Sequence, residues 1–372
     1  MAVKPPERLE KENFLKAPLW RLSNDNGLEV ILTNFGPSVV SIRMPDKSGK
    51  VDDILMGYDS LERYQIDTSS QGRICVGRWA NRIANAQYPQ PDHTFGALRD
   101  GTIAKPGDMV QLQANHSRHI LHGGSPNLAQ MFWDTGSPYF DERSASVPFY
   151  LRSLHLSNGF PGNIALQVIV TLAEDNTLHF QYTAISDRTT PINLTFHGYF
   201  NLNGISTGRT VENHLLITPS KQFLEVDAEL IPTGRICDSH ETIYDFSTPK
   251  LLGKDFGGTG YDICLLFPKD LKFASLFSPE TGRRVIMTTD QPAFQLYTGF
   301  HLPKAGFERF MGVCLEAGKL NDSVNHYLIS HSFQYETTET TCGHRVLPCA
   351  DVFTLPDKPY LHHTCYKFDI FE

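Results

Sequence analysis

Short runs of alternating polar and apolar residues dominate this sequence and set its fold class. Four runs rich in β-branched and aromatic residues cover 28–33, 149–156, 164–171 and 178–185. Period-two alternation of this kind is typical of β-strands with one buried face. Turn-forming pairs such as Asn26-Gly27 separate the runs at close intervals, as expected for antiparallel strands joined by tight turns. The sequence therefore predicts an all-β protein.

Helical patterns are scarce, and only residues 60–64 and 126–132 predict short helices. A parallel sheet with crossover helices is therefore not expected, and a large antiparallel β-sandwich fits better. No fixed-period repeat and no linker rich in Pro, Gly or Ser divides the chain, so we predict a single domain over residues 1–372. Residues 1–16 are charged and contain prolines, and we expect a flexible N-terminal extension there.

Charge and hydropathy limit the partners of this chain. The formal net charge of -8 gives no electrostatic reason to expect nucleic acid or an anionic membrane surface. No segment approaches the roughly 20 apolar residues of a membrane span, and residues 1–16 lack the apolar stretch of a secretory signal. We therefore expect a cytoplasmic protein that binds a neutral small molecule, with no membrane or nucleic-acid partner.

The cysteines predict free thiols. They are seven in number, lack a C-x-x-C spacing and lie mostly beside apolar residues, at positions 75, 237, 264, 314, 342, 349 and 365. A cluster near the C-terminus has none of the usual zinc spacings, and it consists of Cys342, His344, Cys349, His362, His363 and Cys365. We therefore predict no metal site. Phosphate-binding glycine motifs, a G-x-S-x-G elbow and H-E-x-x-H are also absent, so no nucleotide cofactor is expected.

Two predicted strands carry polar residues that could line a binding pocket. Residues 192–202 alternate so that one face is apolar and the other bears Asn193, Thr195, His197, Tyr199 and Asn201. This row fits either a solvated surface or the wall of a pocket. Glu316 is the only charge in the apolar run 312–318, where partial desolvation would raise its pKa and make it a better base. A strand glutamate facing water is the alternative.

Further polar side chains fall on predicted strands. Gln295 and Tyr297 share one face of the run 294–299, and Asp262 opens an apolar run. A histidine and a glutamate together with Asp262 and Gln295 are the groups with which a pocket would bind sugar hydroxyls and move protons. The polar, glycine-rich segments 99–119 and 246–261 are expected to be loops at the rim of such a cleft.

Several co-ordered motifs resemble the aldose 1-epimerase (galactose mutarotase) family over nearly the whole chain. They are Gly-Arg-Trp-Ala-Asn-Arg-Ile at 77–83, Leu-His-Gly-Gly at 121–124, the segment 193–202, Gln-Leu-Tyr-Thr-Gly at 295–299, Cys-Leu-Glu at 314–316 and Asp-Ser-Val-Asn at 322–325. The resemblance implies a large antiparallel β-supersandwich whose concave cleft binds a pyranose. It also implies interconversion of the α and β anomers of a free hexose, such as glucose or galactose, by a monomer or weak dimer without cofactor or metal.

The resemblance also implies roles for individual residues. Glu316 corresponds to the base that takes the proton from the anomeric hydroxyl, and His197 corresponds to the acid that protonates the ring oxygen. The acid form of His197 is an imidazolium, which is expected to titrate near neutral pH. The implied sugar-binding residues are Asn81, Arg82, His122, Tyr199, Asp262 and Gln295.

The chain departs from the family pattern beside these residues. Phe196-His197-Gly198 stands where the family usually has Asn-His-Ser, and residues 317–322 lack the customary Gln and Pro. Three alternatives therefore stay open. One is a sugar-binding or regulatory protein with little turnover, and another is an enzyme for a sugar phosphate, with Arg99, Lys105 and Arg118 as phosphate-binding residues. The third is a glycosidase that uses Asp262 and Glu316 as its two carboxylates.

Overall fold

The computed structural model describes residues 2–67, 69–91, 108–326 and 352–371. In these residues every paired strand runs antiparallel to its neighbour, and α1 (Leu61–Ile66) is the one α-helix. Eight 3₁₀ turns accompany it: Glu12–Phe14, Ala84–Ala86, Leu128–Gln130, Ser157–Gly159, Ile205–Thr207, Leu252–Asp255, Leu302–Ala305 and Ser323–Asn325. The prediction of an antiparallel all-β fold with few short helices is confirmed.

Both short helices expected from the sequence are present. Ser60 caps α1, since its hydroxyl accepts a hydrogen bond from the backbone N–H of Arg63. Asn127 caps the 3₁₀ turn Leu128–Gln130, and Gln130 bonds back to the Asn127 N–H. No helix in the described ranges is long and apolar enough to cross a membrane.

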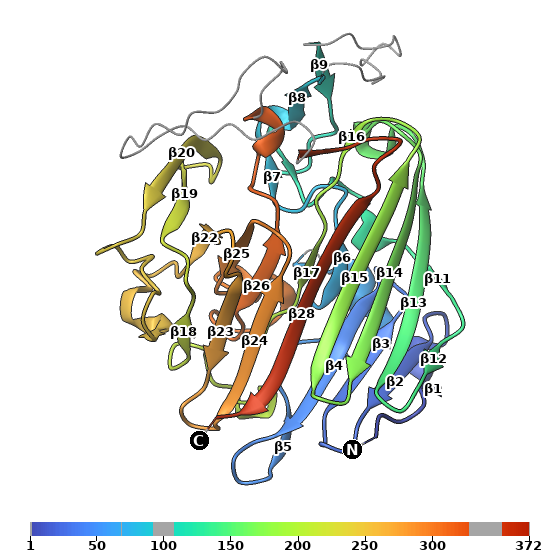
Figure 1. Ribbon diagram of the computed structural model, residues 1–372, viewed down its shortest axis with the longest axis vertical. Helices are drawn as coiled ribbons and strands as arrows, with labels where there is room; N and C mark the ends of the chain where they lie inside the picture. Colours follow the sequence, from blue (N-terminus) through green and yellow to red (C-terminus); the bar gives the residue numbers. More distant parts are fainter. Residues whose placement is uncertain (1, 68, 92–107, 327–351, 372) are drawn as a thin grey trace.

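Two large sheets form the layers of a sandwich. The seven-stranded sheet contains, in spatial order, β1 (Glu7–Leu9), β2 (Leu19–Ser23), β3 (Glu29–Thr33), β4 (Ser38–Pro45), β6 (Arg73–Val76) and β17 (Thr195–His197), with β5 (Val51–Asp53) paired to β4. The ten-stranded sheet contains β11 (Asp134–Thr135), β13 (Ser144–Ser153), β14 (Ile164–Ala173), β15 (Thr177–Ser186), β28 (Tyr360–Ile370), β24 (Arg283–Thr289), β23 (Phe273–Phe277), β18 (Leu215–Ile217) and β21 (Lys250–Leu251), with β12 (Tyr139–Phe140) paired to β13. Figure 1 shows β28 between β15 and β24, so strands far apart in sequence lie side by side.

The third sheet has five strands. Its strands are β20 (Pro232–Asp238), β19 (Gln222–Val226), β22 (Asp262–Leu266), β25 (Ala293–Tyr297) and β26 (Cys314–Gly318). Three strand pairs complete the structure: β7 (Arg82–Ile83) with β10 (Ile120–Leu121), β8 (Gln87–Pro89) with β9 (Met109–Gln111), and β16 (Thr190–Pro191) with β27 (Phe353–Thr354).

One hydrophobic cluster joins the three sheets. In β14, Ile164, Leu166, Val168, Val170 and Leu172 are buried, while the residues between them are more exposed, as the alternation predicts. These side chains share a cluster with those of the seven-stranded sheet and with Leu296 and Leu315 of the five-stranded sheet. Because alternate residues point to opposite faces, Gln295 and Glu316 project from the other face of the five-stranded sheet. The core therefore fixes which side chains are left for a site.

The N-terminal residues differ from the flexible extension expected for 1–16. β1 pairs with β2, Val3 bridges to Asn24, and Phe14 is buried against α1. Apolar side chains at Val3 and Phe14 anchor this part of the chain to the seven-stranded sheet.

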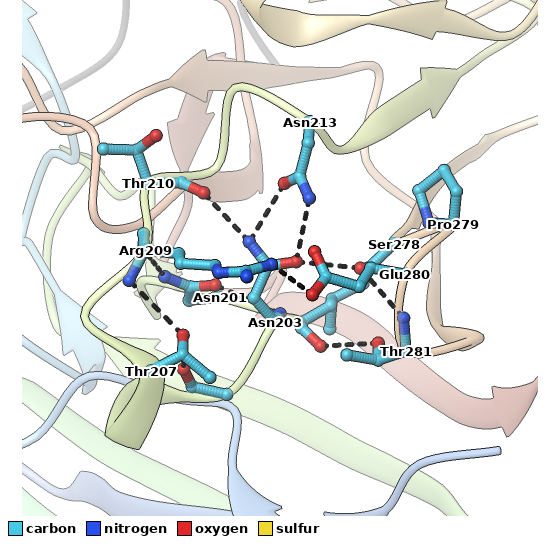
Figure 2. Close-up of polar contacts among 12 residues, drawn as sticks. Asn201, Asn203, Thr207, Arg209, Thr210, Asn213, Ser278, Pro279, Glu280 and Thr281 are labelled. Atoms are coloured by element: carbon cyan, nitrogen blue, oxygen red, sulfur yellow. Dashed lines mark hydrogen bonds and ion pairs between the residues drawn. The ribbon is translucent and has the colours of Figure 1, made fainter. Parts of the chain in front are cut away.

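The segment after His197 is held by asparagine side chains rather than by a continuous strand. Figure 2 shows the network: the Asn203 amide donates to Thr210 O and Asn213 Oδ1, each at 2.9 Å, and Ser278 Oγ donates to Asn203 Oδ1 at 2.9 Å. Asn201 donates to the carbonyls of Arg209 and Met311. These buried bonds satisfy backbone groups that no strand partner reaches, and they fix the chain that follows His197.

Arg78 fixes the segment that carries Asn81 and Arg82 by hydrogen bonds to a neighbouring part of the chain. Its guanidinium is 2% exposed and donates to Ser153 Oγ and to the carbonyls of Leu154, Pro161 and Gly162 at 2.7–3.1 Å. The planar fork of an arginine suits this set of acceptors, because it holds five N–H donors in a fixed geometry.

We expect Arg78→Met to lower the free energy of unfolding by about 3 kcal/mol or more, because several buried carbonyls lose their donor at once. Urea unfolding measures the effect. Arg209→Met is the matched control, because Arg209 lies at the surface and pairs with Glu280, and such pairs contribute about 0–1 kcal/mol. Equal losses in the two variants would contradict this role for Arg78.

Candidate active site

A cavity of about 120 Å³ lies where β17, β22, β25 and β26 meet the chain around β7 and β10. All eight residues singled out from the sequence line it: Asn81, Arg82, His122, His197, Tyr199, Asp262, Gln295 and Glu316. Four other residues complete the lining, namely Ser69, Leu121, Tyr297 and His301. Segments more than 200 residues apart in the chain thus converge on one polar pocket.

A histidine and a glutamate face each other in this cavity. His197 ends β17 and Glu316 is the central residue of β26. His197 Nε2 lies 3.5 Å from Glu316 Oε1, and the two residues are only 4% and 6% exposed. The interpretation of Glu316 as a strand glutamate facing water is therefore wrong.

Burial opposes the charged form of both groups. It lowers the pKa of His197 to about 4, although the negative charge of Asp67 works in the opposite direction. Burial also raises the pKa of Glu316 well above its usual range, and the charge of Asp262 adds to this effect while Arg82 opposes it. The expectation that the His197 ring titrates near neutrality is wrong, because the sequence does not report how deeply the ring is buried.

Aromatic rings surround His197. Its ring centroid lies 5.3 Å from that of His122 in an edge-on arrangement, 5.0 Å from that of Tyr199 and 6.5 Å from that of Tyr297. Tyr199 is held in turn by its hydroxyl, which donates to the carbonyl of Ser69 at 3.0 Å. These contacts restrict rotation of the imidazole and orient it toward Glu316.

A chain of polar contacts crosses the pocket beside the pair. Arg82 lies 3.7 Å from one oxygen of Asp262, and the Gln295 amide donates to the other oxygen. Asn321 donates to Gln295 Oε1 at 2.9 Å, and it is 8% exposed. Sequence reasoning missed Asn321, whose one signal is its position immediately before the Asp-Ser-Val-Asn motif. It fixes the amide orientation of Gln295 and, through it, the position of Asp262.

Asn81 and His122 hold each other by paired backbone contacts. The His122 N–H donates to Asn81 O at 3.0 Å, and the Asn81 N–H donates to His122 Nδ1 at 3.2 Å. Because Nδ1 accepts, the neutral ring carries its proton on Nε2. Burial, together with nearby His197 and Arg82, lowers the pKa of His122 well below its usual value and keeps it neutral.

Gly123 explains the Gly-Gly that follows His122. Its φ is +84°, and a Cβ there would lie 2.4 Å from the backbone of Gly77 and Arg78. Only glycine fits this close approach of two chain segments. The 121–124 motif is thus required by packing beside the pocket as well as by the histidine it carries.

Asp322 ties the end of β26 to the segment that carries Arg82. Its N–H donates to Arg82 O at 3.1 Å, and its Oδ1 accepts from the Ala84 N–H at 2.9 Å. Asn325 donates to the same carboxylate oxygen. The Asp-Ser-Val-Asn motif therefore positions Arg82 and does not itself line the cavity.

The strand expected over 192–202 is shorter than predicted. β17 covers only Thr195–His197, with a register shift against β6, and all residues of 192–202 are buried. The alternation suggested that Asn193, Thr195 and Asn201 share a face with His197, yet none of them lines the cavity. Asn193 instead accepts from the Lys319 N–H, and Asn201 belongs to the network of Figure 2. Alternation carries no information about orientation when both faces are buried.

The departures beside His197 form a packed pair in the core. Phe196 points away from the cavity and stacks on Phe180 at 4.7 Å between ring centroids. A Cβ at Gly198 would lie 2.3 Å from Cζ of Phe196 and 3.1 Å from Cδ1 of Leu55. The phenylalanine therefore requires the glycine, and neither residue lines the cavity.

The described parts of the two loops predicted to rim the cleft do not line the cavity. None of the residues 108–119 or 246–261 belongs to the cavity wall, and short strands, β9 and β21, interrupt both segments. Residues 92–107, which include Arg99 and Lys105, lie outside the described residues. Apolar residues of the second segment, such as Phe246 and Leu252, are part of the core instead.

Ligands for a metal gather at one place in the described ranges. His197, Cys314 and Glu316 offer ligand atoms within 4.8 Å of one another. The cysteine sulfur lies 3.5 Å from Nδ1 and the glutamate oxygen lies 3.5 Å from Nε2, so each contacts a different nitrogen of the ring. Of the cysteine and histidine cluster near the C-terminus, Cys342, His344 and Cys349 lie outside the described residues, whereas His362 is buried and the adjacent His363 is exposed. The described cysteines form no disulfide with one another.

An antiparallel β-sandwich that carries a buried histidine–carboxylate pair in a polar cavity defines a class of acid–base sites suited to carbohydrates. The family model described as aldose 1-epimerase matches residues 18–341. The galactose mutarotase of Bos taurus is 32% identical over 319 residues, which cover 82% of this chain and 86% of that protein. The aldose 1-epimerase of Escherichia coli strain K12 is 32% identical over 325 residues, with 83% and 88% covered.

A solved structure of an aldose epimerase homologue from C. elegans agrees with these relatives. It superposes with a TM-score of 0.78 at 26% identity and covers 96% of this chain and 100% of that chain. This chain belongs to the aldose 1-epimerase family. The prediction of an isomerase of this family is confirmed at that level.

We expect Gly198→Ala to destabilise the fold by about 1–3 kcal/mol, because the added methyl group overpacks the Phe196 ring. Combining it with Phe196→Leu should recover part of that loss, so the double variant should be more stable than the sum of the single effects predicts, by about 0.5 kcal/mol or more. Thermal or urea unfolding of the four proteins measures the coupling. Strict additivity would contradict a packed pair.

Proposed function

We propose that this protein is a mutarotase, which interconverts the α and β anomers of a free hexose such as glucose or galactose. The observation that carries the proposal is the 3.5 Å approach of His197 Nε2 to Glu316 Oε1 at the wall of a polar cavity. A proton donor and a proton acceptor at this spacing can act on two neighbouring oxygens of one sugar ring. The names of the relatives from Bos taurus and Escherichia coli support the same activity.

The remaining cavity residues suit a neutral polyol. Asn81, Arg82, His122 and Gln295 offer N–H donors, and Asp262 offers an acceptor, so each sugar hydroxyl can find a partner. We propose these five residues, together with Tyr199, as the sugar-binding set. Asn321 acts behind them by orienting Gln295.

Burial determines which protonation states of His197 and Glu316 are favoured. Burial favours a neutral His197 and a protonated Glu316, and in this arrangement the pair holds one exchangeable proton. A carboxylate paired with an imidazolium holds the same number of protons, so the two arrangements differ only in where the proton resides. Sugar hydroxyls that donate to Glu316, and the positive charge of Arg82, favour the arrangement with a charged pair.

Ring opening then moves the proton through the sugar. The Glu316 carboxylate takes the proton from the C1 hydroxyl, His197 gives its Nε2 proton to the ring oxygen, and the bond between C1 and the ring oxygen breaks. The products are the open-chain aldehyde, a protonated Glu316 and a neutral His197, which is the arrangement that burial favours. Rotation about the C1–C2 bond and reversal of the proton transfers close the ring as the other anomer.

The alternatives find less support among the described residues. Both oxygens of Asp262 are bound, one by Gln295 and the other by Arg82, which suits a binding role better than that of a glycosidase nucleophile or base. Arg118, a candidate phosphate-binding residue, forms an ion pair with Glu229. A single domain over the whole chain, the cytoplasmic location and the monomer or weak dimer stay predictions, as does the absence of a cofactor or metal.

We expect the purified protein to accelerate the mutarotation of freshly dissolved α-D-glucose or α-D-galactose, measured by polarimetry at neutral pH in a non-catalytic buffer. His197→Asn and Glu316→Gln should each lower kcat by about 10²–10⁴-fold, the range of a single general acid or base step. Folding should be nearly intact, because Gln matches the neutral, protonated Glu316 in volume and charge. Scanning calorimetry of both variants is the control for folding.

Acceleration that survives Glu316→Gln would remove this residue from the mechanism. A protein that binds either sugar in calorimetry but accelerates neither would overturn the proposal in favour of a sugar-binding role. Selective acceleration of a sugar phosphate would identify a different substrate for the same pair.

The pH dependence should be broad. As the pH falls below about 4, the His197 ring becomes protonated while Glu316 stays protonated. The pair then holds two protons and kcat/KM drops. On the alkaline side, kcat/KM should persist until the pH exceeds the raised pKa of Glu316, where the pair loses its one proton. Two unperturbed groups would confine the maximum between about pH 4.3 and 6.5. Polarimetric rates corrected for the uncatalysed reaction at each pH distinguish the two profiles.

A further inference from the structure

Cys314 is a polar neighbour of His197, and its sulfur lies within 4.8 Å of a Glu316 carboxylate oxygen. Its Sγ lies 3.5 Å from Nδ1, and the backbone of His197 itself also forms a hydrogen bond with the ring. Cys314 and Glu316 are two residues apart on β26, so both point to the same face of the strand. One strand thus supplies a group to each nitrogen of the imidazole.

The thiol of Cys314 lies among mostly apolar side chains. Cys314 is fully buried and packs among Met56, Tyr199 and Leu302. Burial and the nearby charges of Glu316 and Asp262 raise the pKa of the thiol well above its usual value, so the sulfur retains its hydrogen. A retained S–H is a weak donor, and the sulfur is also a weak acceptor.

We propose that Cys314 is a positioning residue for His197: its thiol binds Nδ1, holds the ring with Nε2 toward Glu316, and matches either protonation state of Nδ1. This inference rests on the proposed function, because the reaction is what requires His197 to change its protonation state.

The two states of the pair require different behaviour from the partner of Nδ1. When Glu316 is a carboxylate and the ring is an imidazolium, both ring nitrogens donate, and Nδ1–H points to the sulfur lone pair. When the proton of Nε2 has left and Glu316 is protonated, the Glu316 hydroxyl can donate to Nε2 and Nδ1 keeps its hydrogen. In a neutral ring with its hydrogen on Nε2, Nδ1 accepts from S–H instead.

A carboxylate or carbonyl in the place of Cys314 would only accept, and would hold the hydrogen on Nδ1 in every state. A carboxylate would also stabilise the imidazolium strongly and raise its pKa. A thiol that keeps its hydrogen adds no such charge, so His197 can remain a neutral ring and still act as an acid. The other groups that face the ring are His122, Tyr199, Tyr297 and Glu316, with Asp67 acting at longer range.

The test compares Cys314→Ser with Cys314→Ala, because the two replacements differ only by a hydroxyl that can donate and accept. Long-range ¹H–¹⁵N spectra of ¹⁵N-histidine-labelled protein report the tautomer of His197, which is assigned by its loss in His197→Asn. In the wild type and in Cys314→Ser we expect one tautomer. In Cys314→Ala we expect a mixture of tautomers, because Nδ1 has lost its partner.

Turnover provides the second readout. Cys314→Ala should lower kcat by about 10- to 100-fold, the range seen when the outer partner of a ligating histidine is removed. KM should change by less than kcat, and Cys314→Ser should restore most of the loss. Thermal unfolding checks that both variants fold, and Cys314→Val, which also removes the donor and acceptor, replaces the alanine variant if that variant does not fold.

The outcomes separate this inference from the proposed function. Identical tautomers and identical kcat in the wild type and Cys314→Ala would overturn the positioning role while leaving the mutarotase intact. A wild type that accelerates no sugar, yet shows one tautomer that Cys314→Ala turns into a mixture, would overturn the mutarotase and leave the contact between Cys314 and His197 established.

Discussion

Burial of the His197–Glu316 pair at the contact between β17 and β26 is the constraint on which the rest of the site depends. Two ionisable groups in a low-dielectric cavity are costly unless they share protons or neighbouring groups bond to them. Burial lowers the pKa of His197 and raises the pKa of Glu316, so both groups favour their neutral forms. Asp262, the other acid at the cavity, meets the condition through Arg82 and Gln295. The buried groups of the pocket therefore either favour a neutral form or have an oppositely charged or hydrogen-bonding neighbour.

The strands that the sequence predicted well are those with one exposed face. β14 and β15 follow the alternation closely, because the pattern records a core on one side and solvent on the other. The same logic placed Gln295 and Tyr297 on one face of the run 294–299, and both line the cavity. It failed for 192–202, where both faces are buried and the order of polar residues reflects several separate hydrogen-bond networks.

Residues on irregular segments had no periodic signal. Asn81, Arg82 and His122 were predicted from motif resemblance alone, and the structure gives the physical reasons for those motifs: a close backbone approach at Gly123 and a reciprocal pair of bonds between Asn81 and His122. Asn321 and Ser69 could not be predicted, since their places depend on contacts between distant segments. The pKa shifts were equally inaccessible, because they follow from depth of burial.

The place of β28 in the ten-stranded sheet bears on how the chain is made. β28 pairs with β15 on one side and β24 on the other, yet it follows every other strand of that sheet in the sequence. While the chain emerges from a ribosome, the facing edges of β15 and β24 have no partner until residues 360–370 appear. Unpaired edges of this kind invite association with other chains. The sheet can close only late in synthesis, so the edges of β15 and β24 stay open until the last strand has been made.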